Sequence, residues 1–150
     1  MQDRWKVEVK ATPERVWEFV GDLQKHAEWS PKTYRANWLS GAPNAVGSRF
    51  ESFGWLPGKS ENRMEGEVTE NEPSKRFAVR STGEKNDTFT NTFVLSASGD
   101  TTTVEKIQDA PDTTGFMKVM WPMMNGMYVH GAQQKGLDML KAKAEAEAAG

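Results

Sequence analysis

The stretch ATPERVWEFVGDLQKHAEWSP, residues 11–31, predicts two short helices in succession. Thr12 offers a hydroxyl that caps a helix, and Pro13 suits the first helical position because its missing N–H costs nothing there. Apolar residues recur on one side of the following turns until a Gly-Asp pair interrupts them. The next residues, LQKHAEW, predict a second short helix that stops at a Ser-Pro pair, since the residue before a proline disfavours helix.

Extended segments surround these helices. Before them, Trp5, Val7 and Val9 alternate with charged residues, the period-2 pattern of a strand with one buried and one wet face. After them, turn signals separate six further extended segments, with no helical pattern between them. Their short connections suit an antiparallel meander, and the expected strands span residues 33–40, 48–56, 61–71, 76–82, 87–97 and 101–109.

The hydrophobic period changes after DAPDTTG and predicts a long final helix. The residues expected on one face of this helix are Phe116, Met120, Met123, Met127, His130, Gln134, Leu137 and Lys141. Its last turns, KAKAEAEAAG, carry few large apolar groups, so we expect them to be solvated. The whole pattern predicts a single α+β domain, residues 1–150, with a seven-stranded antiparallel sheet, two short helices and a long C-terminal helix.

Composition disfavours several classes of function. The net charge is -2 and both signs are spread along the chain, so we expect no nucleic-acid partner. The absence of cysteine excludes disulfides and thiolate chemistry. The stretch MKVMWPMMNGMYVHG, residues 117–131, is broken by Pro122 and Gly126 and falls short of the roughly 20 apolar residues of a membrane span. Because the amino terminus does not resemble a signal peptide, we expect a cytoplasmic protein. We expect it to be a monomer or a homodimer.

Metal and phosphate sites are also disfavoured. His26 and His130 are the only histidines and neither belongs to a metal-binding spacing, so we expect no metal and no cofactor. His26 lies among polar residues and is expected to be exposed, whereas His130 is in phase with the methionines and faces either a cavity or the core. The segment GWLPGKS, residues 54–60, lacks the spacing of a phosphate-binding loop, so a hairpin turn is favoured.

Residues 11–31, with their Pro-Glu-x-Val-Trp helix and closing Trp-Ser-Pro, closely resemble the opening of START-like (SRPBCC) proteins of the polyketide cyclase/dehydrase branch. Further similar stretches follow at residues 38–50, 66–80, 93–106 and 136–145, so the resemblance covers nearly the whole chain. It implies the helix-grip fold, in which a curved sheet wraps around the C-terminal helix and leaves a hydrophobic cavity. Some members catalyse and many only bind. The chain lacks the GxGGxG loop of the pollen-allergen branch, so that function is not implied.

The methionine-rich stretch is interpreted as a pliable wall of this cavity. Methionine is unbranched and polarizable, and Pro122 with Gly126 should bend the helix over a pocket. A plain methionine-rich core helix is the alternative. Asn91 is the polar member of an otherwise aromatic strand face and is able to orient a carbonyl or hydroxyl group. The expected ligand-binding residues are Phe89, Asn91, Phe93, Met120, Met124, Met127, Tyr128 and His130.

Two functions fit such a pocket. The first is binding of a small hydrophobic molecule, lipid-like or aromatic polyketide-like, without chemistry. The second is a cyclase or dehydratase that positions a polyketide and moves a proton through His130 or Tyr128. A third, a protein-binding adaptor, needs an exposed apolar patch that the sequence does not reveal. In the last strand, alternation leaves open whether Lys106 or Glu105 faces the cavity, and the inward residue would be the stronger acid/base candidate.

Overall fold

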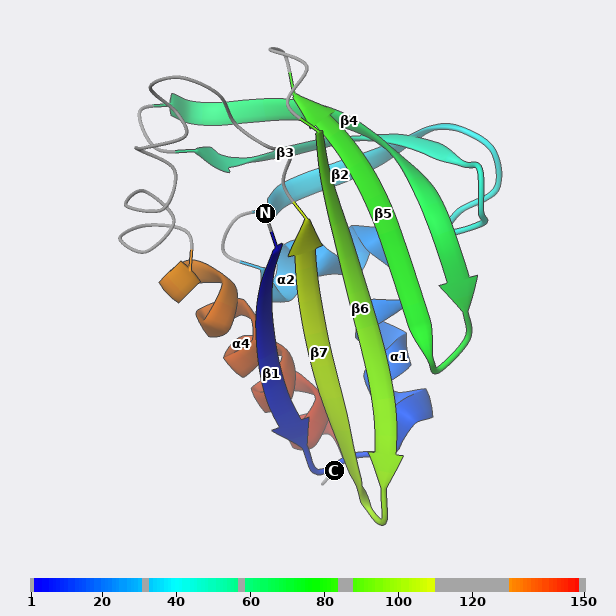
Figure 1. The fold of residues 1–150 in the computed structure, drawn as a ribbon, viewed down its shortest axis with the longest axis vertical. Helices are drawn as coiled ribbons and strands as arrows, with labels where there is room; N and C mark the ends of the chain where they lie inside the picture. The colour runs from blue at the N-terminus through cyan, green and yellow to red at the C-terminus, as the bar shows by residue number, and fades with distance from the viewer. Residues whose placement is uncertain (1, 31–32, 57–58, 84–87, 110–129, 149–150) are drawn as a thin grey trace.

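The computed structural model of the chain describes residues 2–30, 33–56, 59–83, 88–109 and 130–148, with backbone only at residues 34, 55–56, 59–62, 130 and 147–148. Figure 1 shows a curved sheet with helices α1 and α2 on one side and α4 beside its first strand. The elements in chain order are β1 (Gln2–Val9), α1 (Pro13–Val20), the 3-10 helix η1 (Leu23–Lys25), α2 (His26–Trp29), β2 (Thr33–Ser40), β3 (Arg49–Leu56), β4 (Lys59–Glu72), β5 (Arg76–Gly83), β6 (Thr88–Ser98), β7 (Thr101–Asp109) and α4 (His130–Ala148).

The sheet is a seven-stranded antiparallel meander with the order β1-β7-β6-β5-β4-β3-β2. Strands β2 to β6 each pair with the next strand along the chain, and β1 pairs with β7 at one edge of the sheet. Leu56 of β3 pairs with Lys59 of β4, so the GWLPGKS segment joins two antiparallel strands as expected. The predicted α+β helix-grip class is confirmed, because a meander has only short connections and the helices are left to cover one face.

The helices after β1 begin where the sequence places their caps. The hydroxyl of Thr12 accepts a hydrogen bond from the backbone N–H of Arg15 at 3.2 Å, and Pro13 opens α1. The second predicted helix is divided into η1 and α2, and the carboxylate of Asp22 caps η1 by accepting from the N–H of Gln24 at 3.1 Å. These caps satisfy N–H groups that have no partner inside the helix.

Helix α4 covers the free edge of β1. Three of its side chains bond to the backbone of that edge: Gln134 to the carbonyl of Lys6 (3.3 Å), Lys141 to the carbonyl of Glu8 (2.7 Å), and Glu145 to the N–H of Lys10 (2.8 Å). Such cover blocks an edge strand from pairing with other chains. These bonds also show that α4 runs alongside β1 in the same direction.

The buried face of α4 differs from the predicted one. Gln134 and Lys141 were expected to share a face with Leu137, yet both reach the edge of β1 instead. The residues that face the core are Gln133, Leu137, Leu140 and Ala144. The described side chains of the last turns, residues 141–146, are partly or fully exposed as expected, except that of Ala144, which is fully buried. A face of four small or medium residues lets the helix approach the sheet closely there.

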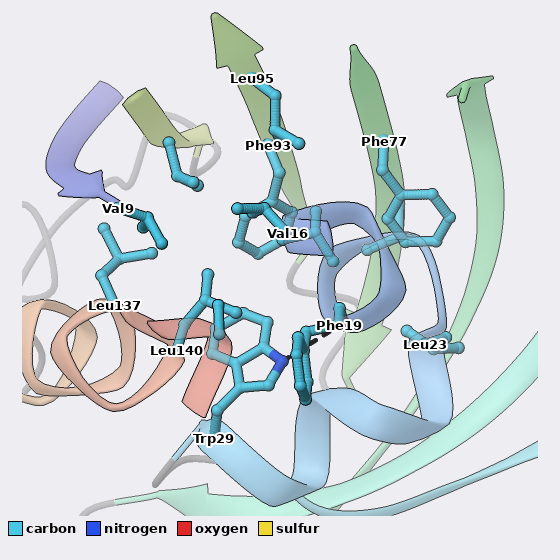
Figure 2. Packing of buried hydrophobic residues seen from close by; sticks show 14 of the residues in the cluster. Val9, Val16, Phe19, Leu23, Trp29, Phe77, Phe93, Leu95, Leu137 and Leu140 are labelled. Carbon is cyan, nitrogen blue, oxygen red and sulfur yellow. Dashed lines mark hydrogen bonds between the residues drawn. The ribbon is translucent and has the colours of Figure 1, made fainter. Parts of the chain in front are cut away.

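One half of the space between sheet and helices is filled by apolar side chains, and we call it the closed half. Figure 2 shows side chains of α1, α2, α4 and the sheet converging there, with the indole N–H of Trp29 donating to the carbonyl of Phe19 at 3.3 Å. Burial of this much apolar surface is the main stabilising contribution to such a domain. The closed half consists of Val9, Val16, Phe19, Val20, Trp29, Leu95, Val104, Leu137, Leu140 and Ala144.

Candidate functional site

The strand pairing fixes which residues of β7 face the helices. Lys106 pairs with Trp5 of β1 on one side and with Phe93 of β6 on the other, and Phe93 pairs with Phe77 of β5. Partners in a sheet point to the same face, and all four side chains are buried, Lys106 with 7% of its surface exposed. The inward residue of β7 is therefore Lys106.

Glu105 points to the opposite, outer face. Its carboxylate lies 2.7 Å from the guanidinium of Arg4 and 3.6 Å from the ammonium of Lys6, both on the outer face of β1. Glu105 therefore forms ion pairs with two cations at the surface. Of Lys106 and Glu105, the two residues between which the strand alternation could not decide, Lys106 is the one that faces the helices.

The Lys106 ammonium lies among polar and aromatic partners inside the protein. Nζ donates a hydrogen bond to the side-chain carbonyl of Gln133 on α4 and lies 5.4 Å from the ring centroid of Phe93. A buried ammonium loses the hydration that stabilises its charge, and a hydrogen bond and an aromatic face compensate for part of that loss.

Asn91 occupies the next position outward on the same face of β6. It pairs with Gln108 of β7 and with Val79 of β5. Its side-chain oxygen Oδ1 is buried, and among the described residues it accepts no hydrogen bond. A buried acceptor without a donor costs about 1–3 kcal/mol. We call Lys106, Gln133, Asn91 and Gln108 the polar belt.

Burial falls along the inner face of β6 from the closed half to the polar belt. Leu95 and Phe93 are buried, with 6% and 3% of their surface exposed. Asn91 and Phe89, the next two inward positions, are only half-buried. The space between the sheet and the helices is thus filled at one end and less completely covered at the other.

His26 separates the two halves, and the expectation that it is exposed was wrong. Only 7% of its surface is exposed, and its ring lies 4.8 Å from Trp29, 5.8 Å from Phe77 and 5.3 Å from Phe93. Its Nε2 donates to the carbonyl of Val20 at 2.8 Å. The polar neighbours that suggested exposure lie on the outer side of the short helix pair, whose 3-10 to α transition shifts the helical phase.

Burial lowers the pKa of His26 from 6.5 to about 4. The hydrogen bond to Val20 and the carboxylate of Asp22 act in the opposite direction, while the positive charge of Lys106 lowers the pKa as well. The imidazole is therefore neutral at pH 7, with its proton on Nε2. The imidazole is thus an uncharged neighbour of Phe93 and Lys106.

The predicted site residues fall into two groups. Phe89, Asn91 and Phe93 lie on the inner face of β6, as their spacing predicts. His130 begins α4, but its side chain lies outside the described residues, as do Met120, Met124, Met127 and Tyr128. Sequence reasoning did not identify Gln133, because its own helical periodicity pointed to Gln134 as the inward residue.

Other kinds of site find little support in the described ranges. Within them, no group of three or more histidine, aspartate or glutamate side chains has the arrangement of a metal site. No helix in the same ranges is long and apolar enough to cross a membrane.

A separate, open depression lies between the first turn of α1, the β4–β5 turn and β6. Its walls include the charged residues Glu14, Glu72, Lys75 and Arg76. An open surface with both charge signs covers an apolar ligand poorly, because such ligands need most of their surface buried. The polar belt is the better candidate site.

Comparisons with known proteins extend over nearly the whole chain. Residues 4–145 match the family described as polyketide cyclase / dehydrase and lipid transport. No curated protein sequence matches the chain.

Solved structures share its fold. TTHA0849 from Thermus thermophilus is 17% identical with a TM-score of 0.78, over 98% of this chain and 99% of that one. The Zhui aromatase/cyclase from Streptomyces sp. R1128 is 15% identical with a TM-score of 0.79, over 97% and 93%. The di-domain ARO/CYC StfQ of the steffimycin biosynthetic pathway is 12% identical with a TM-score of 0.78, over 99% of this chain and 52% of that one.

Proposed function

This chain belongs to the polyketide cyclase / dehydrase and lipid transport family, and on that basis we propose that it binds a small hydrophobic ligand between the sheet and α4. The observation that carries the proposal is the fall in burial along β6, from Leu95 and Phe93 to Asn91 and Phe89. An inner face built of aromatic rings but incompletely covered by the protein is what an apolar ligand needs. The ligand would complete the burial of Phe89.

The composition of the polar belt supports the same proposal. A space meant only as core would be more stable with an apolar residue at Asn91, because its buried Oδ1 accepts no hydrogen bond among the described residues. Ligand sites, in contrast, combine apolar walls with a few polar groups that fix orientation. The neighbouring closed half shows that this chain does fill its interior with apolar side chains elsewhere.

A second candidate function is cyclisation or dehydration of a polyketide in the same place. The inward position of Lys106, held by Gln133, favours it, since an ammonium beside a ligand carbonyl stabilises the enolate that forms during such reactions. Two of the structural neighbours carry aromatase/cyclase in their names. Binding and positioning of the ligand are common to both candidates, so the first is tested first.

Binding is tested with the full chain by native mass spectrometry for a co-purifying apolar compound and by titration with a hydrophobic fluorescent dye. Phe89→Ala should weaken dye binding by about tenfold, because a large apolar contact is lost from the inner face. Phe53→Ala is the matched control. Phe53 lies on β3 beneath the guanidinium of Arg35, 4.0 Å from its ring centroid, so its loss should leave dye affinity unchanged.

Two outcomes would contradict the binding proposal. A wild-type protein that carries no compound and takes up no dye has no ligand space. Equal losses for the Phe89 and Phe53 variants would place the dye on the surface. The second candidate is tested separately by incubation with a reactive poly-β-ketone. A product distribution identical to that without protein would leave binding as the function.

A further inference from the structure

Resting on the proposed function, we propose that the polar belt selects ligands that carry both a hydroxyl and a carbonyl group on one apolar body. Oδ1 of Asn91 accepts a hydrogen bond from the ligand hydroxyl. Nζ of Lys106 donates one to the ligand carbonyl. The residues that determine specificity therefore lie on neighbouring strands, β6 and β7.

The role of Asn91 follows from the chemistry of its oxygen. An amide oxygen only accepts hydrogen bonds, and Oδ1 is buried without a donor among the described residues. Val79, its neighbour on β5, has an apolar side chain and offers none. A ligand atom that satisfies Oδ1 has to carry hydrogen, so a hydroxyl fits and a ketone or ether does not.

The role of Lys106 follows in the same way. An ammonium donates hydrogen bonds and accepts none, so any ligand atom that reaches Nζ has to be an acceptor. Its aromatic neighbours, Phe93 at 5.4 Å and the buried Trp5, suit a flat apolar body beside the polar contact. A carbonyl oxygen on such a body meets both requirements.

Register places the two polar residues close together on one face of the sheet. Lys106 pairs with Phe93, and Asn91 is the next inward residue on β6, so the two are diagonal neighbours on one face. Diagonal neighbours are about 7–8 Å apart between α-carbons, with the β-carbons somewhat closer. Two side chains rooted at that spacing can contact a single fused ring system that carries both groups.

The inference is tested by titration calorimetry of the full chain with two matched probes. The compound 1-tetralone carries a carbonyl alone, and 4-hydroxy-1-tetralone adds a hydroxyl to the same rings. The wild-type protein should bind the hydroxylated probe about five- to tenfold more tightly, the effect of one net hydrogen bond. Asn91→Leu should abolish that preference, so that the two probes bind with equal affinity.

Asn37→Leu is the matched control for this variant. Asn37 lies on β2, where its amide donates to the carboxylate of Glu51 at 3.3 Å. The preference for the hydroxylated probe should survive this substitution. A preference lost equally in both variants would contradict the assignment of Asn91.

Thermal melting without ligand distinguishes a binding role of Asn91 from a structural one. Asn91→Leu removes a buried acceptor that has no donor among the described residues, so the melting temperature should rise by about 3 °C. An asparagine that holds the fold together would give a lower melting temperature when replaced. This measurement also shows that the variant folds.

Lys106→Met should weaken binding of both probes by about tenfold, because both carry the carbonyl. Lys6→Met is its matched control on the outer face, where the Lys6 side chain is 68% exposed, and should change neither affinity. Probes that bind with equal affinity to the wild-type protein, or a preference that survives Asn91→Leu, would overturn the inference and leave the proposed function intact. No binding of either probe or of the dye would overturn both.

Discussion

The closed half and the polar belt are built from the same strands, yet they have opposite composition. On the inner face of β7, Val104 is fully buried beside Leu95, whereas Lys106, two residues further on, carries a charge into the interior. On β6, Leu95 and Phe93 give way to Asn91 in the same manner. The change comes one row earlier on β7 than on β6, since Lys106 pairs with Phe93 and Asn91 pairs with Gln108.

The difference separates stability from recognition within one sheet. Apolar side chains in the closed half gain free energy from leaving water, and they fill the space between sheet and helices. The polar belt contributes a buried oxygen without a donor among the described residues and a buried ammonium, each of which costs free energy. Substitutions in the closed half should therefore affect folding, and substitutions in the belt should affect binding.

The largest expected effect is on the closed half. Leu140 of α4 is fully buried, so Leu140→Ala should lower the free energy of unfolding by about 3–4 kcal/mol through lost burial and a residual cavity. Urea denaturation followed by circular dichroism measures this loss. The ratio of affinities for the two tetralone probes should stay as in the wild type. A changed ratio would contradict the conclusion that the closed half affects folding and the polar belt affects binding.

The next effect concerns His26 at the boundary. Its pKa is 6.5 in the unfolded chain and about 4 in the folded protein, so protons bind preferentially to the unfolded state below pH 6.5. Stability is complete above that pH and falls as the pH approaches 4, by about 3 kcal/mol for this residue. Urea denaturation at pH 7 and pH 4 measures the fall.

His26→Gln keeps an amide donor for the carbonyl of Val20 but does not titrate. The loss of stability between pH 7 and pH 4 should therefore shrink by about 3 kcal/mol in this variant. An unchanged loss would mean that carboxylates elsewhere cause the acid sensitivity and that the pKa of His26 is not lowered in the folded protein.

The smallest effect is expected one residue from Lys106, on the outer face. Glu105→Gln weakens surface ion pairs with Arg4 and Lys6, whose side chains are 57% and 68% exposed. Exposed pairs contribute little, so unfolding free energy should drop by about 0.5 kcal/mol and probe affinity should not change. A tenfold loss of affinity would show that the outer face of β7 also influences the ligand.

The secondary structure could be predicted because its signals are local. Thr12 and Pro13 mark the start of α1, and alternating residues mark the strands, since side chains of a strand point to opposite faces in turn. The same alternation correctly placed Asn91 with Phe89 and Phe93 on one face of β6. These features depend on a few neighbouring residues and so are visible in the sequence.

The candidate site was predicted only in part. Alternation divides β7 into two sets of residues, but each set mixes polar and apolar members, so it does not show which one faces inward. Pairing of Lys106 with buried Trp5 and Phe93 settles this question. The partners come from strands that are distant in the sequence, and no local pattern contains that information.

Local sequence patterns were enough to establish the order of helices and strands, the meander and the aromatic face of β6. The assembled fold was needed to show that Lys106 points inward, that His26 is buried and neutral, and that Gln133 rather than Gln134 faces the core. Periodicity gives the spacing of a face along an element but not its direction in space. That direction depends on which distant residues pack against the element, since burial is a property of the assembled layers.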